Sequence, residues 1–148
     1  MATQWTAGTT AGQILTSATL NTIGAVWVDY TPTLTQGVAV TKTIGHARYC
    51  QIQTLIVVEL FLVCTSTGTA GGTVLVGLPI TAKNAGASAG SGFIYDASAN
   101  FMYNCLPYIN TGTTVASFYQ SGTNFGASPA VTLANTDQLR FKFVYEAL

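Results

Sequence analysis

This sequence contains unusually few charged residues. Only 7% of its 148 residues are Asp, Glu, Lys or Arg, whereas a typical soluble protein has about 25%. The five basic residues are scattered and matched by five acidic ones, which argues against binding of nucleic acid through its phosphates. A surface with so little charge tends to associate with itself. We therefore expect neighbouring subunits to cover part of the surface.

Long hydrophobic runs are also missing. The longest run, Leu55–Cys64, contains Glu59 and is far shorter than the roughly 20 apolar residues of a membrane-spanning helix. The N-terminal stretch MATQWTAGTT has neither the basic nor the apolar segment of a signal peptide. These features predict no insertion into a membrane. Hydrophobic residues nevertheless make up 49% of the chain, which supplies a packed core and argues against disorder.

Cysteine is scarce and unpatterned. The chain has three cysteines, Cys50, Cys64 and Cys105, with no CxxC motif and no cluster of Cys and His. Metal binding is therefore not expected. Two of the three lie in strand-like runs, so we interpret them as buried free thiols that act as small hydrophobic residues. A disulfide is the open alternative.

Residues suited to catalysis are few. The only histidine, His46, follows a glycine at a strand boundary and is interpreted as a turn residue, and no GxSxG motif is present. No two acidic residues are close in sequence, and we expect Glu59 to need a basic partner, placed at a subunit interface. Asp96 and Asn100 predict a turn closed by side-chain hydrogen bonds, with a cation site as the alternative. The chain is thus predicted not to be an enzyme, with no catalytic residue and no cofactor.

From Tyr30 onward the sequence is typical of strands. Thr, Val, Ile, Tyr and Phe dominate, and Gly, Asn, Pro and Ser interrupt them at short intervals. The expected strands are 31–36, 38–44, 47–53, 55–65, 73–78, 92–96, 101–109, 113–120, 130–133 and 138–146. Short strands with regular turns predict an all-β fold, an antiparallel β-sandwich of jelly-roll type. We assign it to residues 30–148.

Residues 1–29 differ from this pattern and are predicted to form an N-terminal anchoring arm. The apolar spacing fits a short helix that begins near Ala18 and ends at Gly24, or else an irregular segment. Neither form could bury its apolar side alone. The arm must therefore dock on its own domain, on a sister subunit or on a larger body.

Two expected strands are informative about assembly. In 138–146, apolar residues alternate with polar ones that carry much of the basic charge, which indicates one buried and one solvated face. The run Leu55–Cys64 is apolar on both faces and must be covered twice. The simplest second cover is a symmetric oligomer, and the alternative is the N-terminal arm. The oligomer-interface candidates are Leu55, Val57, Glu59, Phe61 and Val63.

Short motifs along most of the chain resemble one family. They are WTAG at 5–8, TSATLN at 16–21, Trp27, YTPTL at 30–34, RYCQI at 48–52, TGTAGGTVLVGLP at 67–79 and DQLR at 137–140. In these motifs the chain resembles small structural proteins of tailed-phage virions, of the minor-tail or decoration type. The resemblance implies a trimeric β-sandwich on the exterior of the particle, and it supplies no catalytic residues.

Together these features predict a non-enzymatic structural protein of a phage virion. It would be a homotrimer that contacts other virion proteins of the capsid or tail, with Trp5, Leu20, Trp27 and Tyr30 as anchoring candidates. The alternative is a host-attachment module that binds a surface glycan, since aromatic rings can stack on sugars. No glycan-binding residue is singled out, although seven aromatic residues cluster in sequence: Tyr95, Phe101, Tyr103, Tyr108, Phe118, Tyr119 and Phe125.

Overall fold

The computed structural model describes residues 26–83, 89–109, 115–120 and 122–148. In these ranges every regular element is a β-strand, and all strand pairs are antiparallel. The strands are β1 (Val28–Asp29), β2 (Leu34–Gln36), β3 (Val38–Ala39), β4 (Lys42–Ile52), β5 (Leu55–Cys64), β6 (Val74–Gly77), β7 (Ala89–Asp96), β8 (Phe101–Ile109), β9 (Val115–Gln120), β10 (Thr123–Asn124) and β11 (Gln138–Glu146). The all-β prediction is confirmed, whereas the helix expected near Ala18 lies outside the described residues.

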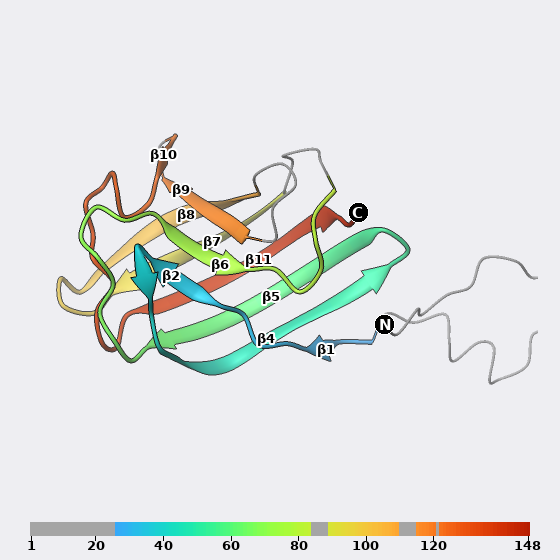
Figure 1. The fold of residues 1–148 in the computed structure, drawn as a ribbon, viewed down its shortest axis with the longest axis horizontal. Helices are drawn as coiled ribbons and strands as arrows, with labels where there is room; N and C mark the ends of the chain where they lie inside the picture. The colour runs from blue at the N-terminus through green and yellow to red at the C-terminus, as the bar shows by residue number, and fades with distance from the viewer. Residues whose placement is uncertain (1–25, 84–88, 110–114, 121) are drawn as a thin grey trace, which may run out of the picture.

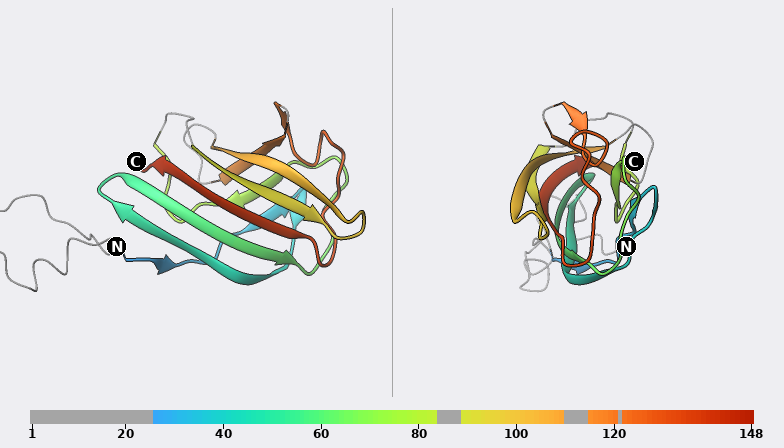
Figure 2. Two further views of the ribbon diagram at one scale, coloured as in Figure 1. Left: turned by 180° about the vertical axis from the view of Figure 1, so that it is seen from behind. Right: turned by 90° about the vertical axis from the view of Figure 1, so that its left-hand side faces the viewer.

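The strands form one sheet that curls into a half-barrel (Figure 1). Their order is β1-β4-β5-β11-β7-β8-β9-β6-β2-β3, and β10 pairs with β9. Figures 1 and 2 show β2, β6 and β9 lying over β4, β5 and β11, so the two ends of the sheet face each other. The result is a sandwich-like fold with one apolar interior.

The interior is filled by every second residue of the long strands, since successive side chains in a strand point to opposite faces. The inward residues of β5 are Ile56, Val58, Leu60, Leu62 and Cys64, each at most 1% exposed. Other fully buried side chains include Phe118, Phe125, Phe143, Leu34, Ile94, Ile109, Leu133 and Leu139. These residues belong to one core cluster, so a single core holds both layers together.

Strand β11 runs through the middle of one layer and pairs with β5 on one side and β7 on the other. Its inward residues are Leu139, Phe141, Phe143 and Tyr145, all buried, while Arg140, Lys142 and Glu146 are exposed. The prediction of a strand with one buried and one solvated face is therefore confirmed. This strand also brings Arg140 and Lys142 next to β5, although β5 is far from them in the sequence.

Two of the expected strands, 38–44 and 47–53, are not separate elements. Residues 42–44 of the first and 47–52 of the second belong to the single strand β4, while Val38–Ala39 forms β3. The register of β4 with β5 shifts between Ile44 and His46. Such a shift marks a β-bulge. A Cβ at Gly45 would collide with the ring of Phe61, so glycine lets the two strands stay paired across the irregularity.

The strand expected at 130–133 is absent. In its place a buried side chain holds this segment: the Gln36 amide Nε2 donates to the Val131 carbonyl, and the Leu133 N–H donates to Gln36 Oε1, both at 2.7 Å. Gln36 is 0% exposed. Its amide thus pairs with the backbone as a neighbouring strand would.

Candidate functional site

The five interface candidates on β5 all lie on one face of the sheet. We call this the outer face, the side of β1, β4, β5, β11, β7 and β8 that points away from the core. Of the five, Leu55 is 43% exposed, and the other four are half-buried. The opposite face of β5 packs against the core. The additional subunit or segment that the sequence predicts over β5 would therefore have to lie on the outer face.

Part of that cover comes from the chain itself. The Arg140 guanidinium carbon lies 4.1 Å from the centroid of the Phe61 ring. Trp27, just before β1, lies with its ring centroid 4.8 Å from the guanidinium carbon of Arg48 and 6.0 Å from Nζ of Lys142. Long basic side chains and one indole therefore shield the middle of the outer face, where cation–π contacts add to the packing.

Glu59 has the basic partner that the sequence predicts. Nε and Nη2 of Arg48 donate to Glu59 Oε2 at 3.1 and 2.8 Å. The hydrogen bond from Arg48 is the main reason why the pKa of the Glu59 carboxyl lies below its ordinary value, and the charges of Arg48, Lys142 and His46 act in the same direction. The pair forms within one chain rather than between subunits.

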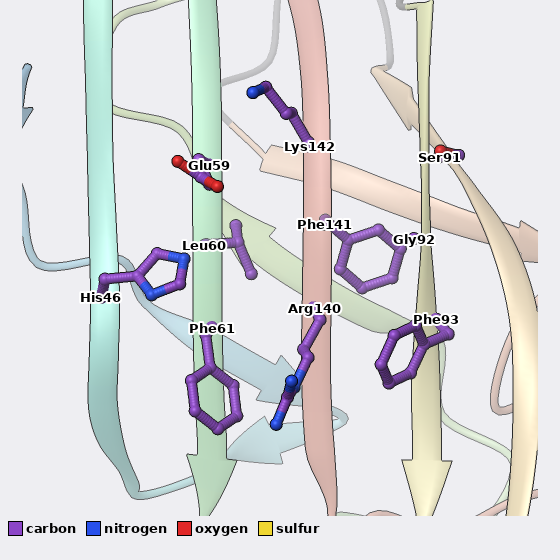
Figure 3. A pocket seen from close by; sticks show the side chains of 10 residues that line it. All are labelled: His46, Glu59, Leu60, Phe61, Ser91, Gly92, Phe93, Arg140, Phe141 and Lys142. Carbon is purple, nitrogen blue, oxygen red and sulfur yellow. The ribbon is translucent and has the colours of Figure 1, made fainter.

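A shallow depression of about 280 Å³ opens on the outer face beside this ion pair. Two rows of cross-strand neighbours line it. In one row, His46 pairs with Phe61, Phe61 with Arg140, and Arg140 with Phe93. In the second row, Glu59 pairs with Lys142 and Lys142 with Ser91. Arg48, the neighbour of Glu59 on β4, lies just outside the lining. Figure 3 shows the Arg140 side chain between the rings of Phe61 and Phe93.

The depression presents more positive than negative charge. Within the described residues, neither Arg140 nor Lys142 forms an ion pair. The Arg140 side chain donates from Nη2 to Gln138 Oε1 at 3.0 Å. Glu59 is the one acidic residue of the lining. The arrangement can therefore bind an anion in contact with aromatic rings.

The anchoring candidates are only partly described. Trp5 and Leu20 lie outside the described residues. Trp27 is 36% exposed and lies on the outer face. Tyr30 packs against the core, with its ring edge-on to Tyr49 at 6.0 Å between centroids. The structure thus brings Trp27 close to the interface candidates, whereas Tyr30 is engaged by its own domain.

The aromatic cluster of the glycan alternative is divided by the fold. Phe118 and Phe125 are 0% exposed and belong to the core. Tyr103 is half-buried, with its centroid 5.2 Å from that of Phe125. Phe101 and Tyr108 remain 53% and 40% exposed. Sugar stacking is therefore open only to some of these rings. The two rings of the depression do not belong to this cluster: Phe61 was predicted as an interface residue, and Phe93 was not singled out.

The smaller predictions concern cysteine, histidine and the Asp96 turn. The three cysteines are free and buried, as predicted, and burial raises the pKa of the Cys64 and Cys105 thiols to about 12. Asp96 Oδ1 accepts hydrogen bonds from the Ser98 hydroxyl and the Ala99 N–H, which confirms the turn. His46 is exposed in β4, next to the bulge rather than in a turn.

The described part of the chain contains no group of three or more His, Cys, Asp or Glu residues placed to hold a metal ion. None of its segments forms a helix that is long and apolar enough to cross a membrane.

The sequence carried a partial signal for the depression. Alternation placed Arg140 and Lys142 on a solvated face and Phe61 on the outer side of its strand. It could not show that β11 lies between β5 and β7, and this order is what brings Arg140 between Phe61 and Phe93.

Comparison with known proteins adds no relative. No model of a known protein family matches this chain, and neither does any curated protein or solved structure.

Proposed function

We propose that this protein is a non-enzymatic structural component of a tailed-phage virion, a homotrimeric β-sandwich of jelly-roll type that decorates or stabilises the exterior of the capsid or tail. Support comes from the sequence motifs that resemble such proteins, from the all-β fold and from the scarcity of charge. The part of residues 1–29 that precedes β1 would attach the domain to other virion proteins.

The observation that carries the proposal is a set of exposed apolar side chains on the outer face, on either side of its charged middle. Ile52 and Leu55 pair across the β4–β5 hairpin and are 50% and 43% exposed. On β8, Met102, Leu106 and Tyr108 are 52%, 62% and 40% exposed. Monomeric soluble proteins rarely leave large apolar patches uncovered, and such patches mark protein contacts. Leu55 and Val57 at the hairpin end are therefore the centre of the proposed subunit interface.

The mechanism would be mechanical rather than chemical. Each subunit contact would contribute about 25 cal/mol for every Å² of apolar surface removed from water. A closed trimer satisfies the apolar face without leaving an open-ended surface for further growth. The same burial on a capsid or tail platform would hold neighbouring virion proteins together.

Localisation tests the virion role. Mass spectrometry of purified particles of the phage that encodes this chain should detect the protein, and gold-labelled antibodies raised against residues 26–148 should bind intact particles. Detection only in the lysate of infected cells, with none in purified particles, would contradict the proposal.

A specific observation also favours the second candidate, a host-attachment module. The depression on the outer face combines cations that have no ion-pair partner in the described chain with two aromatic rings. Such a combination is suited to a ligand that is both charged and ring-shaped. Decoration and attachment are compatible, because the hairpin end and the depression are different parts of the same face.

A further inference from the structure

We propose that the depression on the outer face binds a carboxylated sugar unit, such as a uronic or sialic acid residue of a surface glycan. The inference rests on the attachment function proposed above and specifies its ligand. Arg140 would receive the carboxylate, Phe93 would contact the sugar ring, and Lys142 would add positive charge at the other end of the depression.

The charge of the depression selects an anion. Arg140 and Lys142 alternate on one strand, so both project from the same face of β11. Glu59 is already engaged by Arg48, and neither of the other two cations forms an ion pair among the described residues, although Lys142 is the cross-strand neighbour of Glu59. A guanidinium binds a carboxylate through two parallel hydrogen bonds. Figure 3 shows Lys142 directed away from Arg140 along β11, so its ammonium adds positive charge to the depression without sharing the same contact.

The position of Arg140 is fixed before any ligand arrives. Its guanidinium carbon lies 4.1 Å from the Phe61 centroid and 5.8 Å from the Phe93 centroid, and Gln138 accepts from one of its nitrogens. Figure 3 shows the guanidinium held between the two rings. A side chain that is already oriented loses less conformational entropy on binding.

The size and lining of the depression favour a sugar over other anions. Small-molecule sites usually measure about 300–1,000 Å³, so about 280 Å³ suits one ring rather than a long chain. Both Arg48 nitrogens donate to Oε2 of Glu59, so Oε1 can accept from a sugar hydroxyl, and the Ser91 hydroxyl can do so too. The apolar face of a sugar ring can lie on Phe93. An acidic peptide would use the cations but would have no need of these hydroxyl partners.

Titration of the full-length protein with defined small molecules tests the site. D-Glucuronate and N-acetylneuraminate would be compared with uncharged glucose, with acetate and with a hexaglutamate peptide, by saturation-transfer NMR and calorimetry. We expect saturable binding of at least one of the two sugar acids, at least tenfold tighter than glucose or acetate. Arg140→Gln should weaken it at least tenfold, and Lys142→Gln and Phe93→Ala should each weaken it severalfold. Lys83→Gln, which removes a cation paired with Glu146 away from the depression, should leave it unchanged.

The outcomes separate the site from the function. Equal binding of glucose, equal binding of acetate, or tighter binding of hexaglutamate would each overturn the assignment to a carboxylated sugar, as would failure to bind either sugar acid. Adsorption of the purified wild-type protein and of its Arg140→Gln variant to host cells is measured in parallel. Adsorption that persists in Arg140→Gln would overturn the site while preserving the attachment function. Absence of adsorption together with intact sugar-acid binding would overturn the attachment function alone.

Discussion

Replacing Gln36 with leucine should show how the fold holds a segment that belongs to no strand. Leucine nearly preserves the volume of the side chain but removes both of its hydrogen bonds. Those bonds join Gln36 to Val131 and Leu133, which lie 95 and 97 residues away in sequence. The substitution therefore tests a long-range tie between β2 and the last loop before β11.

The expected loss follows from the partners left behind. The Val131 carbonyl and the Leu133 N–H would remain buried without their partner, and each unsatisfied buried group costs about 1–3 kcal/mol. Part of this loss is offset because the apolar leucine is cheaper to bury than an amide. We expect the free energy of unfolding to fall by about 3 kcal/mol, and the Tm by roughly 6–12 °C for a chain of this size.

Urea denaturation followed by circular dichroism would measure the loss, and hydrogen exchange would locate it at the Leu133 amide. Gln51→Leu is the matched control, because the Gln51 amide donates to the Gln53 carbonyl in an exposed hairpin, and surface changes of this kind usually cost at most about 0.5 kcal/mol. If Gln36→Leu lost no more than Gln51→Leu, or if the Leu133 amide stayed protected, the reasoning would be refuted.

Three further predictions concern the interior and the ion pair. Gly126 has a φ of 96°, and a Cβ there would collide with the Gly72 carbonyl. Gly126→Ala should therefore lower the free energy of unfolding, measured by denaturant titration, by about 1–3 kcal/mol or more. A loss under about 0.5 kcal/mol, the size usual for a surface substitution, would contradict this. The three buried thiols should not react with a thiol reagent at pH 8 until denaturant is added; rapid labelling of the native protein would contradict their burial. Because the pKa of Glu59 is lowered in the folded state, its stabilising effect is present above its unfolded pKa and is lost as pH falls through the folded value. Stability should therefore decline less on acidification in Glu59→Gln than in the wild type, and parallel pH profiles would argue against a stabilising role for the Arg48–Glu59 pair.

The alternation of apolar and polar residues predicted those strands in which every second side chain is buried. The bounds of β8 and β11 agree with the predicted 101–109 and 138–146, because their inward residues bury themselves at every second position. The break in this regularity at Gly45 was not predictable in the same way. The strand β4 continues through a bulge at this glycine. In the sequence, a glycine between two strand-like segments indicates a turn, so two strands were expected there.

Features that depend on contacts between distant parts of the chain were harder to predict from the sequence. The segment 130–133 has strand composition, but its hydrogen-bond partner is the side chain of Gln36 rather than a neighbouring strand. Likewise, Arg140 stands between Phe61 and Phe93 only because β11 inserts between β5 and β7. Periodicity reports which face a residue occupies, and strand order decides what it meets there.

The central proposal, assembly through the outer face, is tested most directly by the mass of the protein in solution. Sedimentation equilibrium of the full chain at micromolar concentration should give three times the subunit mass of 15.4 kDa. Leu55→Glu should shift the protein to the monomer, while Val38→Glu, an equally polar change at an exposed site on β3, should leave the trimer intact. A wild-type chain that sediments as a folded 15.4 kDa monomer would contradict the account.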